Sequence, residues 1–177
     1  MENKLNIVFL KNGSRLLLAS VLLGFLAACA TAPAPAPVED REVQEKVREP
    51  ARQQNSGVQV YPLQNPAVKS LLTEARESEA AGDYDSAAIS LERALRIQPR
   101  DPELLQHMAE IQLHKKDYNQ AMSFASRSFD IGPRVGEICS RNWHTISVAK
   151  EHQSDTKGAR EARQRAGECM NTKPEQY

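Results

Sequence analysis

Aromatic residues, glycine and long apolar runs are scarce in this chain of 177 residues. Aromatic side chains make up 5% of it and eight positions are glycine, whereas Ala, Leu, Glu, Arg and Gln are frequent. This composition favours helices and argues against a β-sandwich or barrel. Basic and acidic residues number 23 each, so no excess of positive charge draws the chain to nucleic acid.

Motifs of catalysis and metal binding are missing as well. The histidines form two pairs, His107 with His114 and His144 with His152, spaced seven or eight residues apart. A zinc protease would place its pair at i and i+4. The sequence also has no phosphate-binding glycine loop and no nucleophile motif. We therefore expect no enzyme activity, no metal and no cofactor.

The longest apolar run lies near the N-terminus and is too short to cross a membrane. It has 13 residues, at positions 16–28, whereas a spanning helix takes about 20. Three basic residues precede the run. A cleaved signal peptide over residues 1–28 fits this pattern better than a transmembrane anchor.

The end of the apolar run, Leu26, Ala27, Ala28 and Cys29, resembles the lipobox of bacterial lipoproteins. The resemblance implies cleavage before Cys29 and lipidation of its thiol. Ala30, where an aspartate would retain the protein in the inner membrane, implies sorting to the outer membrane with the chain facing the periplasm. Acyl chains contribute about 0.8 kcal/mol per buried CH₂ and would hold the protein there. The alternative is a plain signal peptide followed by a chance cysteine.

Residues 29–66 show no helical or strand period. Alternating Ala and Pro at 32–37 favour extended polyproline II, and further prolines interrupt the rest of the segment. The charged residues 39–49 are compatible with a short helix, but we interpret the whole segment as a disordered tether. It either carries the next domain toward a partner away from the lipid or only relieves crowding at the membrane.

Residues 67–173 repeat with a period of 34. A shift of 34 superimposes Asp83 on Asp117, Tyr84 on Tyr118, Ala87 on Ala121 and Pro99 on Pro133. The pattern resembles the tetratricopeptide repeat (TPR), a hairpin of two antiparallel helices. Its small residues let the helices approach closely, and its prolines end the second helix. A generic pair of helical hairpins is the alternative.

A third, looser unit comes after the two clear repeats and starts four residues late. Trp143 takes the large-residue place of this unit, and Asp155 lies at its turn. We therefore predict an all-α array of about three TPR hairpins, six helices in all, over residues 67–173. Residues 174–177 form a tail.

Cys139 and Cys169 lie at equal distances from the turn of the third hairpin, near residue 154. Residues equidistant from a hairpin turn lie side by side on antiparallel helices. Both cysteines also fall on the faces that the two helices turn toward each other. Because the periplasm is oxidising, we predict a disulfide between them. The alternative is two buried free thiols.

In TPR arrays the first helix of each hairpin lines a concave groove. The resemblance therefore implies a partner-binding groove that is polar with a few apolar anchors, suited to an extended or helical peptide segment. Its predicted residues are Lys69, Leu72, Arg76, Gln106, Glu110, Leu113, Arg141, His144 and Val148. The alternative for each position is a solvated helix face.

The lipobox, the proline-rich tether, the small TPR domain and the run Arg141-Asn142-Trp143 together resemble TPR-containing outer-membrane lipoproteins of gamma-proteobacteria. Some members of this group activate a class A penicillin-binding protein, a peptidoglycan synthase of the inner membrane. The resemblance implies that function, with a protein partner in the periplasm and membrane attachment through the lipid alone. The alternative is a scaffold or assembly factor for an envelope complex such as a pilus or secretion system.

Overall fold

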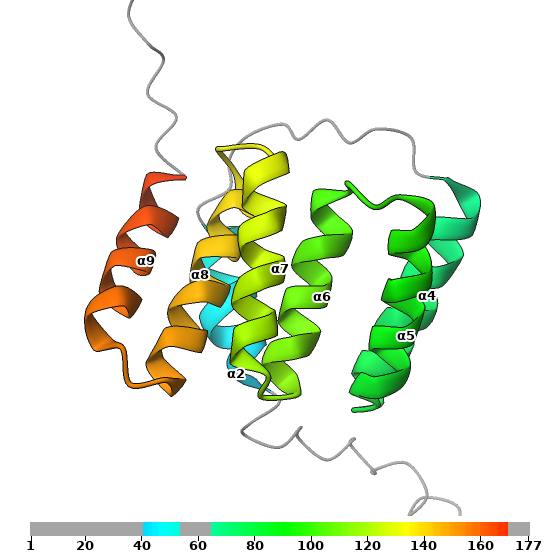
Figure 1. Cartoon of the computed structure of the whole chain (residues 1–177), viewed down its shortest axis with the longest axis horizontal. Helices are drawn as coiled ribbons and strands as arrows, with labels where there is room; N and C mark the ends of the chain where they lie inside the picture. Colours follow the sequence, from blue (N-terminus) through cyan, green and yellow to red (C-terminus); the bar gives the residue numbers. More distant parts are fainter. Residues whose placement is uncertain (1–40, 54–64, 170–177) are drawn as a thin grey trace, which may run out of the picture. The chain divides into compact units, whose positions relative to one another are not determined.

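The computed structural model describes residues 41–53 and 65–169 of the chain (Figure 1). The predicted signal peptide, the lipidation site at Cys29 and the tail at 174–177 lie outside the described residues. All elements in the described part are helical. In chain order they are α2 (Arg41–Val43), η3 (Gln44–Arg48), α3 (Glu49–Gln53), α4 (Pro66–Ala80), α5 (Tyr84–Ile97), α6 (Pro102–His114), α7 (Tyr118–Ile131), α8 (Glu137–His152) and α9 (Thr156–Glu168).

The elements from α4 to α9 form three helical hairpins, as the sequence predicted. α4 packs on α5, α6 on α7 and α8 on α9, and successive hairpins join through α5–α6 and α7–α8 (Figure 1). α6 also contacts α8, so the first helices of these two hairpins lie side by side. The all-α class and the TPR array are confirmed. No helix of the described ranges is long and apolar enough to cross a membrane.

An aspartate begins the second helix of every hairpin. The side chains of Asp83, Asp117 and Asp155 each accept a hydrogen bond from the backbone N–H three residues later, at 2.8 to 3.1 Å. A cap of this kind stabilises a helix by about 1 kcal/mol. The aspartates that the repeat period identified are therefore helix-starting residues, and they fix where each second helix begins.

Each hairpin turns through one residue in the left-handed backbone region, directly before the aspartate. These residues are Gly82, Lys116 and Ser154, with φ angles of 76°, 60° and 62°. Only glycine adopts this conformation without steric cost. The second and third turns therefore keep the geometry of the first and carry backbone strain that glycine would relieve.

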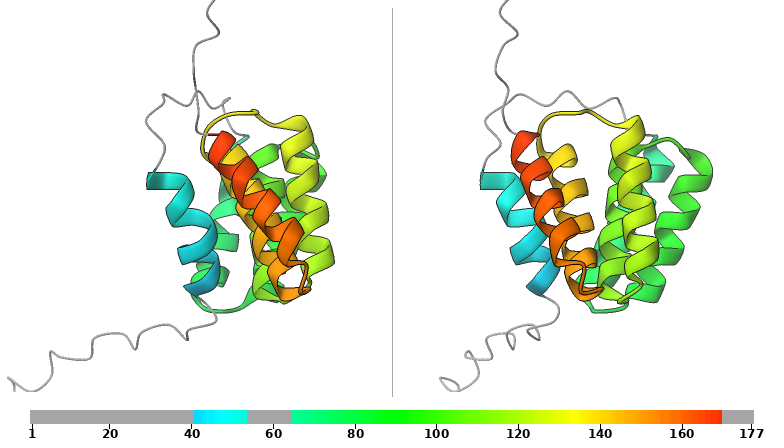
Figure 2. Two further views of the ribbon diagram at one scale, coloured as in Figure 1. Left: turned by 90° about the vertical axis from the view of Figure 1, so that its left-hand side faces the viewer. Right: turned by 60° about the vertical axis from the view of Figure 1, so that its left-hand side comes forward.

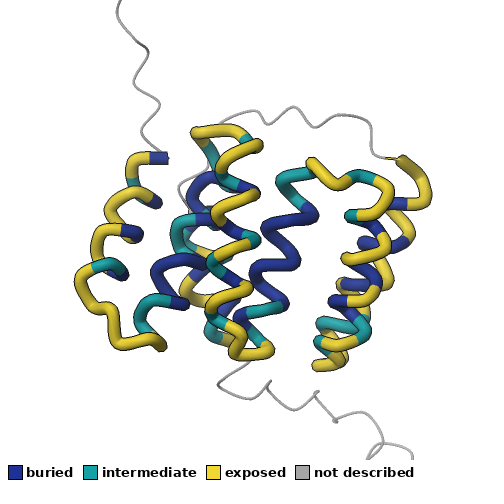
Figure 3. The backbone as a smooth tube through the Cα atoms, viewed as in Figure 1, coloured by how far each residue is buried: buried dark blue, intermediate teal, exposed yellow. Residues whose placement is uncertain are grey.

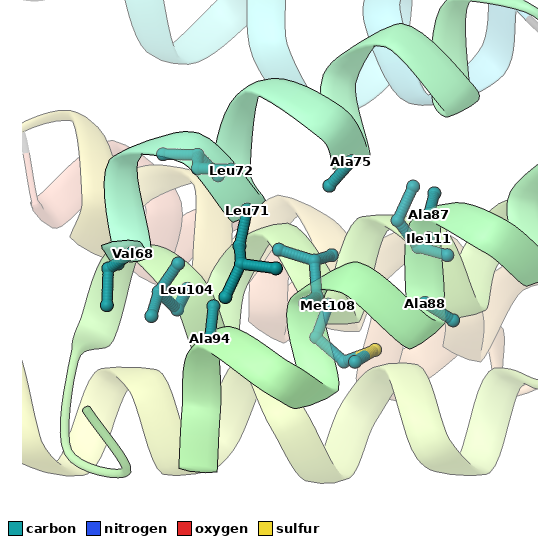
Figure 4. Packing of buried hydrophobic residues seen from close by; sticks show 11 residues of the cluster. Val68, Leu71, Leu72, Ala75, Ala87, Ala88, Ala94, Leu104, Met108 and Ile111 are labelled. Atoms are coloured by element: carbon teal, nitrogen blue, oxygen red, sulfur yellow. The ribbon is translucent and has the colours of Figure 1, made fainter. Parts of the chain in front are cut away.

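Small residues lie where the helices of a hairpin meet. Ala87, Ala94 and Ala121 are all 0% exposed, so the predicted register is confirmed. Figure 4 shows Ala87 and Ala94 within the core cluster that also contains Leu104 and Met108. α6 is buried along most of its length because helices pack on several of its sides (Figure 3).

A disulfide joins the start of α8 to the residue that follows α9. Cys139 and Cys169 are bonded, with their Cα atoms 5.7 Å apart, as predicted from their positions about the turn. Next to the bridge, the Gly136 N–H donates to the Cys169 carbonyl at 2.9 Å. The third hairpin is thus closed at the end opposite its turn.

Residues 41–53, assigned to the disordered tether from the sequence, are instead helical and packed. Val43, Val47 and Ala51 are 2%, 0% and 0% exposed, and they recur every four residues. This spacing places all three on one face of a helix, where they meet the array. The tether interpretation missed this stripe because charged residues surround its three small apolar members.

The helix of residues 41–53 contains a wide turn in its middle. Gln44–Arg48 form a π-helical turn, and the Glu49 N–H bonds to the Gln44 carbonyl five residues back. The turn ends two residues before Pro50, whose ring would crowd the carbonyl four residues back in a regular α-helix. A π-turn relieves that crowding and lets the helix continue.

Two glycine substitutions test the role of backbone conformation. Gly82→Ala is expected to lower the free energy of unfolding by about 1 kcal/mol, because an added Cβ meets no neighbour within 4 Å and only the left-handed φ opposes it. Gly167→Ala, also without a neighbour within 4 Å but inside α9, is expected to raise it by up to about 1 kcal/mol. Urea unfolding measures both, and effects of equal sign would contradict this explanation.

Removing the disulfide is expected to cost about 3 kcal/mol in the free energy of unfolding, because the bridge closes a loop of 30 residues in the unfolded chain. The double substitution Cys139→Ala and Cys169→Ala, unfolded in urea beside the oxidised wild type, measures this. A thiol count on the denatured mature protein checks the bond directly. Two reactive thiols at these positions would show that it does not form.

Candidate functional site

Five of the nine residues predicted to line the groove form one connected surface on α6 and α8, under residues 41–53. They are Gln106, Glu110, Leu113, Arg141 and Val148, and all but Arg141 are buried. Together with Glu79 and Glu151 we call this surface the inner face. Figure 2 shows residues 41–53, in cyan, running beside α8 on this side of the array.

The other four predicted groove residues lie elsewhere. Leu72 belongs to the core cluster of α4, α5 and α6 and is 3% exposed, so it supports the fold and is not available as an anchor. Lys69 and Arg76 are exposed on α4, and Arg76 pairs with Glu103 at 3.3 Å. His144 is half-buried. Its pKa is lowered mainly by burial and also by the positive charge of Arg163.

The centre of the inner face is the carboxylate of Glu110, which is 0% exposed. Arg141 of α8 donates to both of its oxygens at 2.8 Å. Arg48 of η3, in the helix of residues 41–53, also donates to this carboxylate at 2.8 Å. Gln106 adds a fourth hydrogen bond at 3.0 Å and holds Thr145 at 2.9 Å. A buried charge is tolerable only when a charged partner and hydrogen bonds compensate for its lost hydration, as Arg141 and Gln106 do here from within the array.

Glu79, at the end of α4, is the second carboxylate of the inner face and is partly buried. Arg48 donates to one of its oxygens at 2.6 Å. His107 contacts the other oxygen at 2.8 Å, and His114 approaches to 3.5 Å. One arginine of the N-terminal helix therefore bridges the first and second hairpins through Glu79 and Glu110.

The pKa values of the two carboxyl groups follow from these contacts. Burial alone would raise the pKa of Glu110, but the charges of Arg141 and Arg48 outweigh it and hold the pKa well below its ordinary value. Burial would also raise the pKa of Glu79, and hydrogen bonds from His107 and His114, with the charge of Arg48, lower it instead. Both groups are thus carboxylates at neutral pH.

Further charges of the N-terminal helix meet the last turn of α8. Lys46 lies 3.4 Å from Glu151, which Arg163 of α9 also contacts. Glu42 pairs with His152 at 2.7 Å. These contacts are partly solvated, so each is weak, and together they fix the direction of the helix along α8.

Two stacked pairs of aromatic rings repeat along the array. His114 stacks on Tyr84 with ring centroids 4.4 Å apart, and His152 stacks on Tyr118 at 4.6 Å, both with planes 6° apart. In each pair the histidine ends the first helix of one hairpin and the tyrosine begins the second helix of the preceding one. His114 and His152 therefore contribute contacts between neighbouring hairpins.

Trp143, part of the run that the sequence resemblance singled out, contacts residues away from the inner face. Its ring meets Phe129 of α7 edge-on, with centroids 4.9 Å apart. Arg165 of α9 lies over Trp143 at 4.7 Å, and Arg134 lies over Phe129 at 4.1 Å. This cluster joins α7, α8 and α9 and stabilises the third hairpin.

The sequence did not predict two features of the site. Glu79 lies on a helix predicted to line the groove, but nothing in the sequence signals that it meets His107 and Arg48, which are distant in the chain. The helix of residues 41–53 did carry a signal, the apolar stripe at every fourth position. Among the described residues, no group of three His, Cys, Asp or Glu side chains is placed to hold a metal ion.

The buried carboxylate of Glu110 makes stability depend on pH. Its folded pKa lies below the ordinary 4.5, so its contribution is present above about pH 4.5 and is lost as the pH falls toward 2. We expect Glu110→Gln to cost at least about 2 kcal/mol at pH 7 and to flatten the loss of stability between about pH 4.5 and 2.5. Urea unfolding across this range measures both effects.

Glu92→Gln, which removes an exposed carboxylate of α5, is the matched control for that substitution. An equal slope of stability against pH in wild type and Glu110→Gln would show that the carboxylate is not held as a charge by its arginines.

Comparisons with known proteins place the array in a family. Residues 79–133 match the tetratricopeptide-repeat model. The solved structure of the globular C-terminal domain of P. aeruginosa LpoP is 37% identical in sequence, with a TM-score of 0.56, over 59% of this chain and 99% of that chain. A comparison with curated proteins gave no match. Since the identity extends over nearly the whole of that domain, this chain belongs to the LpoP-like family of tetratricopeptide-repeat proteins.

Proposed function

We propose that this chain is an outer-membrane lipoprotein whose TPR domain binds and activates a class A penicillin-binding protein in the periplasm. The observation that carries the proposal is the 37% identity to the LpoP domain over 99% of its length. The function itself comes from the family resemblance of the sequence. Two features support the compartment: the lipobox ending at Cys29 and the disulfide between Cys139 and Cys169, a bond that persists where thiols are oxidised.

Activation by such a protein is a matter of binding. The described residues present paired charges, stacked rings and helix caps, all of which stabilise the array. A binding protein raises the rate of a synthase only if it has higher affinity for the active conformation than for the resting one. A rigid array of three hairpins, closed at one end by a disulfide, offers a preformed surface for that purpose.

Attachment to the outer membrane would require the domain to reach an inner-membrane partner. Because residues 41–53 pack on the array, the connection to the anchor runs from Cys29 to Arg41, a distance of 12 positions in the chain. Fully extended, it spans at most about 40 Å. The domain can therefore stand off from the lipid by about that distance while this helix stays docked.

The test is to add the purified mature chain to a class A penicillin-binding protein from the same envelope and measure glycan polymerisation and cross-linking. We expect the rate to rise several-fold and to saturate with concentration. Bovine serum albumin at equal concentration is the control for crowding. An unchanged rate would contradict the activator function. Recovery of pilus or secretion components instead of a synthase from cross-linked envelopes would favour the scaffold alternative.

A further inference from the structure

The helix of residues 41–53 contacts the array as a bound peptide helix would. α2 lies against α6, and η3 and α3 lie against α8 (Figure 2). Val43 and Val47 form an apolar cluster with Leu113 and Val148 of the inner face. The two valines lie one turn apart, the spacing by which amphipathic helices are usually recognised.

Charge complementarity accompanies the apolar contact. The inner face presents the carboxylates of Glu79, Glu110 and Glu151. The N-terminal helix meets them with Arg48, at 2.6 and 2.7 Å from the first two, and with Lys46, at 3.4 Å from the third. The inner face therefore selects a helix whose apolar stripe is flanked by basic residues.

The array keeps its own partners for these carboxylates when the helix leaves. Glu110 would retain both hydrogen bonds from Arg141 and one from Gln106. Glu79 would retain its contacts with His107 and His114. When Arg48 departs, neither carboxylate is therefore left without a partner. An unpaired buried charge would have made the helix an essential part of the fold.

The apolar contact of the helix is also small. Two valines and one alanine provide it, and eleven residues, 54–64, join the helix to the start of the array. A short linker keeps the local concentration of the helix near the millimolar range, so even a weak contact stays formed until a competitor arrives.

We propose that residues 41–53 are a built-in competitor for the inner face, which a helix of the partner displaces. The displacing helix presents two aliphatic residues four positions apart with an arginine directly after the second, as Val43, Val47 and Arg48 do here. The identity of the partner rests on the proposed function, but the competition does not. Binding of the partner and release of residues 41–53 are then one equilibrium.

Release also changes the reach of the lipid anchor. With the helix bound, the folded unit begins at Arg41, 12 positions after Cys29, and the intervening chain spans at most about 40 Å. With the helix released, the folded unit begins at Asn65, 36 positions after Cys29, and the reach is at most about 120 Å. A partner that displaces the helix therefore lengthens the chain between Cys29 and the array, and the domain can then bind a partner farther from the membrane.

A peptide titration tests the competition on the mature chain. A fluorescent synthetic peptide of residues 41–53 is titrated into wild type, Arg48→Ala and Val47→Asp, two substitutions that weaken the internal helix but leave the inner face intact. We expect the peptide to bind both variants at least about tenfold more tightly than wild type, because the internal competitor is weakened. Arg52→Ala, which removes the same charge from an exposed position of the same helix, is the matched control and should bind like wild type.

The peptide with Val47→Asp is the specificity control and should not bind any chain. Circular dichroism establishes that each variant keeps the array. Equal affinity of wild type, Arg48→Ala and Val47→Asp for the unaltered peptide, or no binding to any of them, would overturn the proposal.

A second arm separates this inference from the proposed function. If the wild type activates the synthase but the peptide titration is the same for all chains, the function stands and the competition is wrong. If the peptide binds the two weakened variants as expected but no class A penicillin-binding protein is activated, the competition stands and the proposed partner is wrong.

Discussion

The arrangement of this domain depends on one buried charge, the carboxylate of Glu110 in the middle of α6. At 0% exposure it must be paired, and the fold supplies Arg141 from the next hairpin and Arg48 from the N-terminal helix. The first pair ties α6 to α8. The second brings residues 41–53 onto the same face, where Arg48 also reaches Glu79. One carboxylate thus connects hairpin packing to the contact that covers the inner face.

How much of this could be predicted depends on the range of each signal in the sequence. Hairpin packing repeats every 34 residues, so Ala87 and Ala121 revealed it, and the cysteine pair followed from its symmetry about a turn. The ion pairs of Arg48 join residues 31 and 62 positions apart, and no period connects them. The prediction that Leu72 lines the groove failed for a related reason. The family pattern indicates which face of α4 the residue lies on, but contacts with α5 and α6, which are distant in the chain, decide that it is buried in the core.

The third hairpin shows how an array of this kind ends. Its turn keeps the left-handed residue and the capping aspartate of the first two, although Ser154, like Lys116 in the second turn, stands where the first turn has glycine. A disulfide and the contact of Trp143 with Phe129 and Arg165 secure its far end. A terminal repeat has a neighbour on one side only, so these extra contacts replace the packing that a fourth hairpin would provide.

The central claim is that residues 41–53 are docked on the inner face in the free protein. Amide hydrogen exchange of the mature chain measures this directly, because backbone N–H groups of a packed helix exchange far more slowly than those of an open chain. We predict slowed exchange at residues 44–49 in wild type, measurably faster than in α6 and α8 because the segment opens on its own. Exchange at the rate of an unstructured peptide in these residues, with α6 and α8 fully protected, would contradict it.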